Sequence, residues 1–218
     1  MYQPTHFRED SLAVQHALIR AHPLGLLITL EKTGIVANPV PFVLDADASP
    51  RGTLKCHVAR ANRLWQDFDP AHEALVIFQG VERYITPSWY ATKQETGKVV
   101  PTWNYVIVQA YGPLVVRDDR DWLAQQIGEL TALQESARQD PWAVSDAPEP
   151  FVKAQLNAIV GLEIPISRIE GKWKVSQNRP ERDREGVVQG LHAEQDDTAR
   201  AMAALVGAKR ENGGAAST

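Results

Sequence analysis

The chain has 218 residues, 44% of them hydrophobic, which is enough to bury a sizeable core and makes one domain the simplest expectation. Its formal net charge of -4 at pH 7 lacks the basic surplus that drives sequence-independent binding to nucleic-acid phosphates, so direct DNA binding is not expected. Cys56 is the single cysteine, so an intrachain disulfide is excluded and a reduced, cytoplasmic setting is expected. Residues 1–10 hold no apolar run and no apolar stretch of ~18 residues follows, so neither secretion nor membrane insertion is expected.

An amphipathic helix is predicted between Asp10 and Pro23, where apolar residues recur at helical spacing. Its expected apolar stripe consists of Val14, Ala17, Leu18 and Ala21. Residues 25–36 predict a strand hairpin. Because Pro39 and Pro41 remove two backbone donors, the second strand is expected to lie at a sheet edge or to be irregular.

Residues 52–58 alternate strictly between two faces of a predicted strand. One face carries Leu54, Cys56 and Val58, and the other carries Thr53, Lys55 and His57. A short helix is expected over 61–68, and strands are expected over 74–79 and 102–116. Acidic residues at the start and an apolar stripe predict a helix over 118–135.

The remaining chain predicts another helix over 151–160 and a strand pair that turns at Glu170-Gly171. About seven strands and four helices without a regular βαβ order predict a mainly β, α+β fold, in which an antiparallel barrel or sheet carries peripheral helices. The expected domains are a barrel over 1–191, a C-terminal helical extension over 192–210 and a disordered tail over 211–218.

The segment GTLKCHVARAN, residues 52–62, brings four hydrogen-bond donors to one strand end and the turn after it. They are Lys55, His57, Arg60 and Asn62. A phosphate monoester carries nearly two negative charges and several acceptor oxygens, so cationic and amide donors suit it. The alternative is that these side chains form the solvated face of an edge strand.

Residues 83–93 and 100–105 combine aromatic rings with short polar side chains. The rings belong to Tyr84, Trp89, Tyr90, Trp103 and Tyr105, and the polar neighbours are Ser88, Thr102 and Asn104. A flat amphipathic ring system such as isoalloxazine needs planar apolar walls and a few hydrogen-bond partners. Core packing uses the same aromatic residues and is the alternative interpretation.

Residues 171–186 form the most basic stretch of the chain. Its cations are Lys172, Lys174, Arg179, Arg182 and Arg184. Such a stretch suits a second phosphate contact, a dimer contact or a nucleic-acid patch, although a solvated loop is the commonest outcome. Three interspersed acids weaken the nucleic-acid alternative.

Several common motifs are absent from the chain, namely GxGxxG, a Walker-type loop, CxxC, HExxH and GxSxG. Dinucleotide-binding Rossmann folds, nucleotide hydrolases, common zinc sites and nucleophile-elbow hydrolases therefore have no motif behind them. The histidines lack metal-type spacing, so no metal site is expected. These patterns assign no residue a catalytic role.

Four separated segments resemble the PaiB family of FMN-binding negative transcriptional regulators, a branch of the FMN-binding split barrels that is distantly similar to pyridoxamine-phosphate oxidases. The segments are MYQPTHF, HVARAN, the pair YITPSWY and VPTWNY, and KVSQNRPERDREGVVQGL. They occur in the expected order and cover Met1 to about Leu191. The resemblance implies an antiparallel split β-barrel of the FMN-binding type that forms a homodimer, with FMN at the subunit interface.

The resemblance also implies where the cofactor is held. His57, Arg60 and Asn62 are expected at the phosphate end, with Lys55 on the same strand face as His57. Further pocket residues, some of them from the partner subunit, are Ser88, Trp89, Trp103, Lys174 and Gln177.

Three positions depart from the family pattern. Cys56 stands where a glycine is expected, Arg63 where a proline is expected and Gln109 where a histidine is frequent. None of these changes removes a proposed phosphate donor, but Gln109 leaves any role of that histidine open.

Three functions are compatible with these features. The first is a regulatory FMN-binding protein whose effect on transcription is direct or indirect. The second is an FMN-dependent oxidoreductase, similar to flavin reductases or pyridoxamine-phosphate oxidases, that acts on a small molecule. The third is a split barrel that binds haem or another ligand, or that has lost its cofactor. The resemblance favours the first, in which no catalysis is required, and the FMN-dependent oxidoreductase stays open as the alternative.

Overall fold

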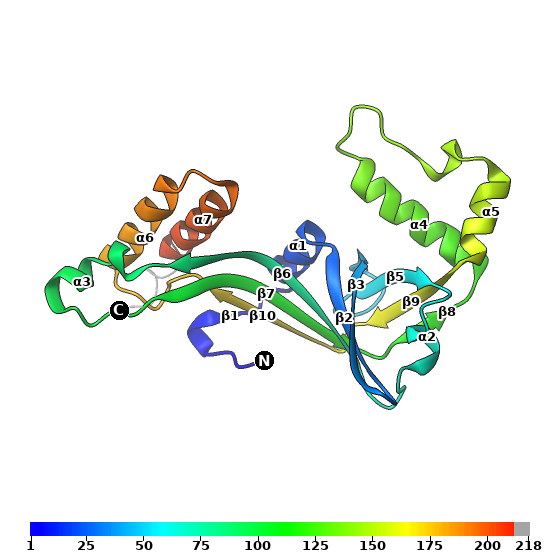
Figure 1. Ribbon diagram of the computed structural model, residues 1–218, viewed down its shortest axis with the longest axis horizontal. Helices are drawn as coiled ribbons and strands as arrows, with labels where there is room; N and C mark the ends of the chain where they lie inside the picture. The colour runs from blue at the N-terminus through cyan, green and yellow to red at the C-terminus, as the bar shows by residue number, and fades with distance from the viewer. Residues whose placement is uncertain (212–218) are drawn as a thin grey trace. The chain divides into compact units, whose positions relative to one another are not determined.

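The computed structural model describes residues 1–211, with side chains described through residue 208. Within that range it contains ten β-strands and seven α-helices, more than the sequence patterns predict (Figure 1). The chain divides into two compact units, each built from separate stretches of sequence. Strands β6 (Ala74–Ile85) and β7 (Thr102–Gly112) contribute to both units. The domain boundaries expected from the sequence stay a prediction.

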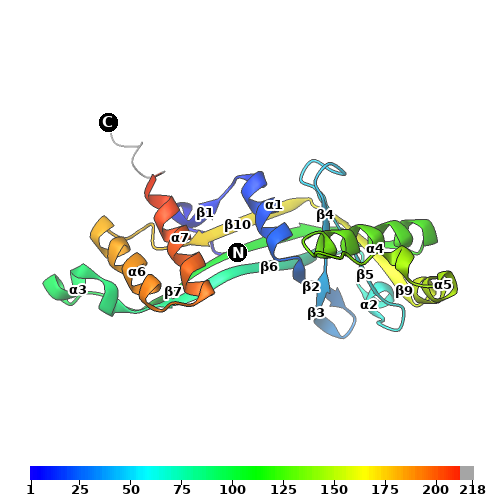
Figure 2. The same ribbon diagram turned by 90° about the horizontal axis from the view of Figure 1, so that it is seen from above.

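Unit 1 comprises Met1–Ser11, Gln79–Val108 and the chain from Glu170 onward. Its elements are η1 (Thr5–Phe7), β1 (Arg8–Glu9), η2 (Pro87–Trp89), α3 (Ala91–Thr96), α6 (Glu181–Ala193) and α7 (Asp197–Glu211), with parts of β6, β7 and β10 (Arg168–Lys174). Helices α6 and α7 lie side by side over one face of the strands of this unit (Figures 1 and 2). A helix was expected over 192–210, and α7 occupies most of that range. The tail expected to be disordered falls almost entirely outside the described residues.

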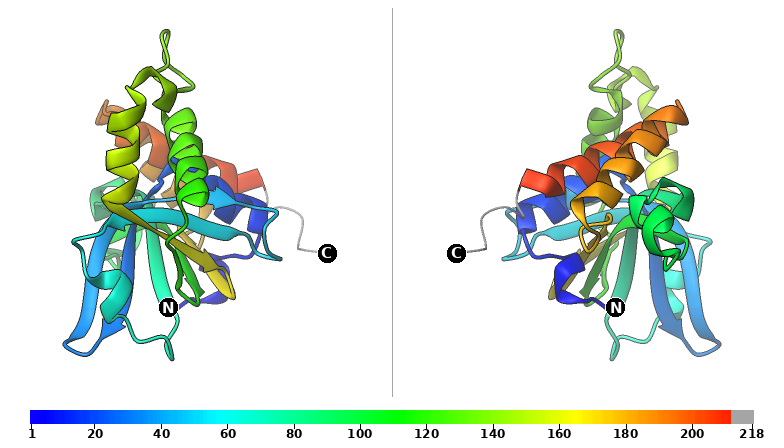
Figure 3. Two further views of the ribbon diagram at one scale, coloured as in Figure 1. Left: turned by 90° about the vertical axis from the view of Figure 1, so that its right-hand side faces the viewer. Right: turned by 90° about the vertical axis from the view of Figure 1, so that its left-hand side faces the viewer.

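Unit 2 comprises Leu12–Phe78 and Gln109–Ile169. Its helices are α1 (Leu12–Ala21), α2 (Leu64–Asp67), α4 (Arg120–Glu135), η3 (Val144–Asp146) and α5 (Glu149–Asn157). Its own strands are β2 (Leu24–Glu31), β3 (Gly34–Pro41), β4 (Val43–Asp45), β5 (Thr53–Ala59), β8 (Val115–Arg117) and β9 (Ile159–Pro165). Helices α4 and α5 pack against each other and against β9, as the left view of Figure 3 shows.

The strands form two open sheets. One has the order β1-β10-β7-β6-β2-β3 and the other has the order β4-β5-β9-β8. Strand β2 pairs antiparallel with β3 and β6, and β5 pairs antiparallel with β4 and β9. This arrangement agrees with the predicted α+β class of antiparallel strands with peripheral helices. Strand β3 lies at a sheet edge, as Pro39 and Pro41 predict.

Helix α1 forms where it is predicted but buries a different stripe. Its buried residues are Gln15, His16, Leu18 and Ile19, whereas Val14, Ala17 and Ala21 are exposed. The ring nitrogen Nε2 of His16 lies 2.9 Å from the carbonyl oxygen of Arg51, so this polar side chain has a partner inside the protein. Apolar spacing alone misses such a face, because a polar group can be buried once it is hydrogen-bonded.

The strand pair predicted around Glu170-Gly171 is wrong. Strand β9 pairs with β5 and β8 in the four-stranded sheet, whereas β10 pairs with β1 in the six-stranded sheet. Residues 159 and 160, which the sequence assigns to a helix, instead begin β9. Apolar alternation identifies a strand but not its partner, so two consecutive strands can enter different sheets.

Strand β5 is central in its sheet, between β4 and β9, and Lys55 and His57 on its polar face are half-buried, which contradicts the interpretation of a solvated edge strand. Leu54, Cys56 and Val58 lie in the core on one face, and burial raises the pKa of the Cys56 thiol far above its ordinary value. Helix α4 covers the other face. There Gly161 of β9, which lies opposite His57, provides room for the ring of Trp122. None of the described helices combines the length and apolar content that a membrane span requires.

The contact between α4 and the sheet predicts that Gly161→Ala destabilises the protein. The added methyl group would lie 2.2 Å from the Trp122 ring, and overpacking of this kind costs about 1–3 kcal/mol of unfolding free energy. Gly128→Ala is the matched control, because that methyl group meets nothing within 4 Å and removing a helix glycine stabilises by about 0.5–1 kcal/mol. Urea unfolding of both variants tests this. Equal unfolding free energies for the two variants would show that Trp122 of α4 is not closely packed against Gly161.

Candidate functional site

The nine residues predicted to bind the cofactor fall into two groups that belong to different units. Four lie in unit 2, namely Lys55, His57, Arg60 and Asn62. Five lie in unit 1, namely Ser88, Trp89, Trp103, Lys174 and Gln177. The contacts described below for each group all lie within its own unit.

Lys55 and His57 project from one face of β5 into the layer beneath α4. The ammonium group of Lys55 donates a hydrogen bond of 2.7 Å to Asp45 Oδ2 on the neighbouring strand β4. His57 Nδ1 lies 2.7 Å from Oε1 of Gln126 on α4. The Nε2 group of Gln126 is buried and has no hydrogen-bond partner in the described part of the chain. Both predicted phosphate donors therefore already have side-chain partners: Lys55 has Asp45 on β4, and His57 has Gln126 on α4.

The ion pair between Asp45 and Lys55 shifts the pKa values of both side chains. The hydrogen bond from Lys55 holds the pKa of the Asp45 carboxyl below its ordinary value of 3.8. Burial acts to lower the pKa of Lys55, but the hydrogen bond to Asp45 and the nearby carboxylates of Glu129 and Glu163 outweigh it, so that pKa is raised. The positive charge of Lys55 is therefore already compensated within the chain.

The turn after β5 directs its side chains to further local partners. The guanidinium group of Arg60 makes two hydrogen bonds to the carboxylate of Asp118, at 2.9 and 2.6 Å, and others to the carbonyl oxygens of Asn157 and Ile159. The hydrogen bond to Asp118 raises the pKa of Arg60. Asn62 accepts a hydrogen bond of 3.1 Å from the amide of residue 64, near the start of α2. The structure thus gives the four donors of this segment separate protein partners.

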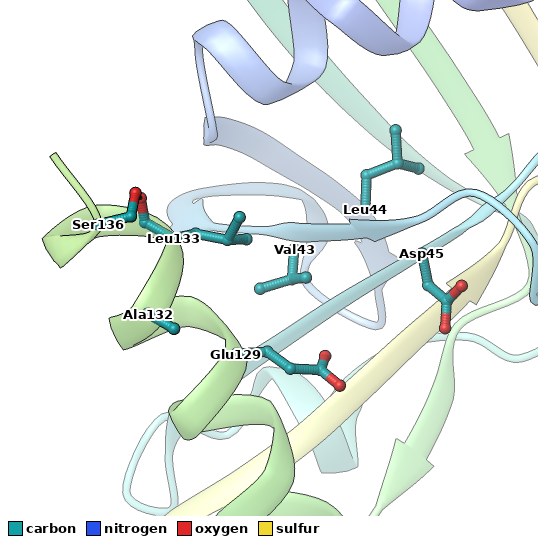
Figure 4. A pocket seen from close by; sticks show the side chains of 7 residues that line it. All are labelled: Val43, Leu44, Asp45, Glu129, Ala132, Leu133 and Ser136. Carbon is teal, nitrogen blue, oxygen red and sulfur yellow. The ribbon is translucent and has the colours of Figure 1, made fainter. Parts of the chain in front are cut away.

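A pocket of about 560 Å³ lies between β4 and α4. Figure 4 shows Val43 and Asp45 extending from β4 toward α4, while Leu44 extends from the opposite side of the strand. Glu129 and Leu133 approach from the helix. None of the nine predicted residues lines this pocket. Its two carboxylates do not suit a phosphate, and one of them is occupied by Lys55.

The lowered pKa of Asp45 predicts an acid-sensitive contribution to stability. A carboxyl group whose folded pKa is depressed stabilises the fold above its unfolded pKa, and this contribution is lost as the pH falls through the folded value. Below about pH 3.8 the ion pair with Lys55 should progressively weaken. Asp45→Asn should reduce the unfolding free energy near neutral pH by about 0.5–1 kcal/mol, since solvent screens a partly exposed pair.

Urea unfolding at several pH values measures this difference, with Asp47→Asn as the control because Asp47 is exposed. Asp45→Asn should lose part of the acid dependence of the wild type, and Asp47→Asn should keep it. The same acid dependence in Asp45→Asn and the wild type would contradict the assignment.

In unit 1, Tyr84 of β6 and Trp103 of β7 form an exposed aromatic pair. Their ring centroids are 5.9 Å apart at an interplanar angle of 70°. Tyr84 is 46% exposed and Trp103 is 51% exposed, which is unusual for large rings in contact. Val100, in the loop before β7, is exposed as well. This patch provides a planar apolar surface that the chain itself leaves uncovered.

A group of cations accompanies the aromatic rings of unit 1. Lys174 Nζ donates hydrogen bonds to the hydroxyl of Thr102 and to the carbonyl oxygen of Trp103. Burial and the nearby charges of Lys172 and Arg179 lower the pKa of Lys174. The site-residue prediction includes Lys174 but misses Lys172 and Arg179. The signal for both was present in the basic stretch 171–186, but sequence spacing does not distinguish a clustered cation from a solvated one.

The other predicted residues of unit 1 have structural partners. Trp89 packs on helix α6, where a methyl group at Gly190 would lie 2.3 Å from its ring and one at Gly186 would clash with its carbonyl oxygen. Gln177 accepts a hydrogen bond from the amide of Val175 and donates one to the carbonyl oxygen of Trp173. Ser88 is exposed and accepts a hydrogen bond from the side chain of residue 93. Trp103 and Lys174 are therefore the members of this group best placed to meet a ligand.

The two open antiparallel sheets with attached helices define a split-barrel protein, and solved structures share this fold. The flavocytochrome Anf3 from Azotobacter vinelandii matches with a TM-score of 0.56 and 13% identity, over 77% of this chain and 69% of its own. The FAD and heme binding protein from Mycobacterium smegmatis matches with a TM-score of 0.51 and 15% identity, over 77% of this chain and 73% of its own.

Residues 1–168 match the family described as "Putative FMN-binding domain", and the chain belongs to this family. An uncharacterized protein of Emericella nidulans is 35% identical, with 98% of both chains covered. The protease synthase and sporulation protein PAI 2 of Bacillus subtilis is 29% identical, over 94% of this chain and 96% of its own. These matches confirm the resemblance to the PaiB family that the four sequence segments indicate.

Proposed function

We propose that this chain binds FMN at the interface of a homodimer and acts as a flavin-binding regulator of the PaiB type. The observation that carries the proposal is the exposed pair of Tyr84 and Trp103 beside Lys174, in a chain that belongs to a family described by FMN binding. A cytoplasmic location, expected from the lone cysteine, forms part of the proposal. The net charge of -4 favours an indirect effect on transcription over direct DNA contact.

The residues present fit a flavin in their chemistry. An isoalloxazine ring needs planar apolar contact, which Tyr84 and Trp103 offer, and it needs donors for its carbonyl oxygens and ring nitrogens. Lys174 lies against the backbone of Trp103 and can supply such a donor. Bound FMN would contribute the redox chemistry, while the chain orients the ring and binds the phosphate.

The exposed rings also support the homodimer. Large apolar side chains that remain exposed side by side are typical of surfaces that bind another protein or a ligand. Tyr84, Val100 and Trp103 all belong to unit 1, where a second copy of the chain would cover them together with the flavin.

Two simple measurements test the proposal. Denaturing the purified protein should release a chromophore with a flavin spectrum and the mass of FMN, and light scattering should give the mass of a dimer. Released FAD or riboflavin would correct the identity of the cofactor. A protein that contains no flavin and binds none on titration would overturn the proposal.

Arg60 provides a sharper test of the phosphate end. If Arg60 binds the FMN phosphate, Arg60→Ala should weaken FMN affinity roughly ten- to a hundredfold, since a charge-assisted hydrogen bond contributes about 1.5–3 kcal/mol. Asp118→Asn keeps the guanidinium group but removes the carboxylate that occupies it in the structure. FMN affinity should therefore be retained or increased in Asp118→Asn.

Fluorescence titration with FMN measures both variants, and thermal melting monitors their folding. The opposite pattern, in which both variants melt earlier and bind FMN as the wild type does, would make Arg60 a structural residue that joins β5 to Asp118. The phosphate role of Arg60 would then be refuted.

A further inference from the structure

Three cations of unit 1 have no carboxylate partner. They are Lys172, Lys174 and Arg179, and among the side chains that the structure describes no acidic group lies within ion-pair distance of any of them. Other cations of the chain are paired, as in Lys55 with Asp45 and Arg60 with Asp118. Several exposed cations, such as Lys32 and Lys98, also form no ion pair among the described side chains, so this cluster is distinguished by the burial of one of its cations, Lys172.

Burial makes the missing counter-charge costly. Lys172 is only 8% exposed. Its ammonium group donates a hydrogen bond of 3.0 Å to the carbonyl oxygen of Tyr2 and lies 5.6 and 5.4 Å from the ring centroids of Tyr2 and Tyr105. These partners are neutral, so they satisfy a donor without cancelling the charge.

Two of the three cations lie near one aromatic ring, that of Tyr105. Lys172 and Lys174 are two residues apart on β10 and therefore share a face, and both ammonium groups lie within 6 Å of the Tyr105 ring, at 5.4 and 5.9 Å. Arg179 follows in the loop before α6 and stacks over the ring of Tyr90 at 4.7 Å. After burial and Lys172, the charge of Arg179 also acts to lower the pKa of Lys174.

Some hydrogen-bond donors of the cluster are not used by protein groups. An ammonium group has three donors and a guanidinium group has five. Lys172 uses one donor, for Tyr2, and Lys174 uses two, for Thr102 and Trp103. Arg179 forms no ion pair within the described part of the chain. Free donors and uncompensated positive charge at one place suit an oxyanion with two charges and several oxygens.

We infer that Lys172, Lys174 and Arg179 together form a binding site for the phosphate group of a phosphomonoester, next to the exposed aromatic pair. The inference deepens the proposed function and rests on it insofar as the phosphomonoester is FMN itself. In that case this cluster takes the place of Arg60 at the FMN phosphate, and Lys174 contacts the phosphate instead of the isoalloxazine ring. The same chemistry also admits the phosphate of a separate small molecule. With either ligand, the group bound at the cluster is a dianionic phosphate.

The test uses inorganic phosphate, FMN and riboflavin as probes on the full-length protein. Arg179→Gln and Lys174→Gln each remove one charge of the cluster. Arg182→Gln is the matched control, because Arg182 belongs to the same basic stretch but is exposed and already paired with Glu95 at 2.7 Å. Melting temperature as a function of phosphate concentration, and affinities for both flavins, are measured for all four proteins.

Inorganic phosphate should raise the melting temperature of the wild type and of Arg182→Gln. The effect should be largely lost in Arg179→Gln and Lys174→Gln, with an apparent phosphate affinity weakened about tenfold or more. If the flavin is the source, the wild type should prefer FMN to riboflavin, and this preference should fall about tenfold in the two cluster variants. If a separate ligand is the source, the preference should stay unchanged while the phosphate effect persists in flavin-loaded wild type.

Two results would overturn the inference. One is a wild type that phosphate does not stabilise and that binds FMN and riboflavin equally well. The other is a loss in Arg182→Gln as large as that in Arg179→Gln, which would indicate a general effect of surface charge. Phosphate stabilisation without any flavin binding would instead refute the proposed function and leave the site standing.

Discussion

Unit 2 is organised by strand β5, whose apolar face is buried and whose polar face is half-buried beneath α4. One face carries apolar residues into the core, and the other carries Lys55 and His57 into a layer covered by α4. A polar face can be buried only if its groups find partners, and Asp45 and Gln126 supply them. The same layer contains Glu163, which accepts hydrogen bonds from Arg117 and Trp122 and so joins α4 and β8 to β9. These hydrogen bonds fix helix α4 against the sheet.

The two groups of cations considered as ligand contacts, one in each unit, differ in how their charges are balanced, and this difference bears on function. In unit 2, Lys55 and Arg60 are neutralised by Asp45 and Asp118, so an incoming phosphate would have to compete with a carboxylate for each of them. In unit 1, Lys172 and Lys174 beside Tyr105 and Arg179 over Tyr90 have neutral partners only. An anion arriving there gains attraction without breaking an ion pair. The cations of unit 1 are therefore better placed to bind an anionic ligand, although the HVARAN segment predicts the phosphate site at the turn after β5.

Family membership and site chemistry answer different questions about this chain. The match over residues 1–168 establishes the family, and structures at 13% and 15% identity show only that the fold is shared. Which flavin is bound, and by which side chains, depends on local charge and exposure. Trp89 illustrates the point, because its place in a family segment predicts a pocket residue, whereas the structure packs it onto two glycines of α6.

Local residue patterns are enough to predict several of the strands and helices. The hairpin of β2 and β3, the apolar face of β5 and the position of α4 follow from residue spacing and caps. The order of four segments was sufficient to identify the family. Only the tertiary structure decided that β9 and β10 enter different sheets, that α1 buries Gln15 and His16, and which cations have carboxylate partners. These features depend on contacts between residues far apart in the chain, and neither periodicity nor composition encodes which distant group will supply a hydrogen bond or a counter-charge.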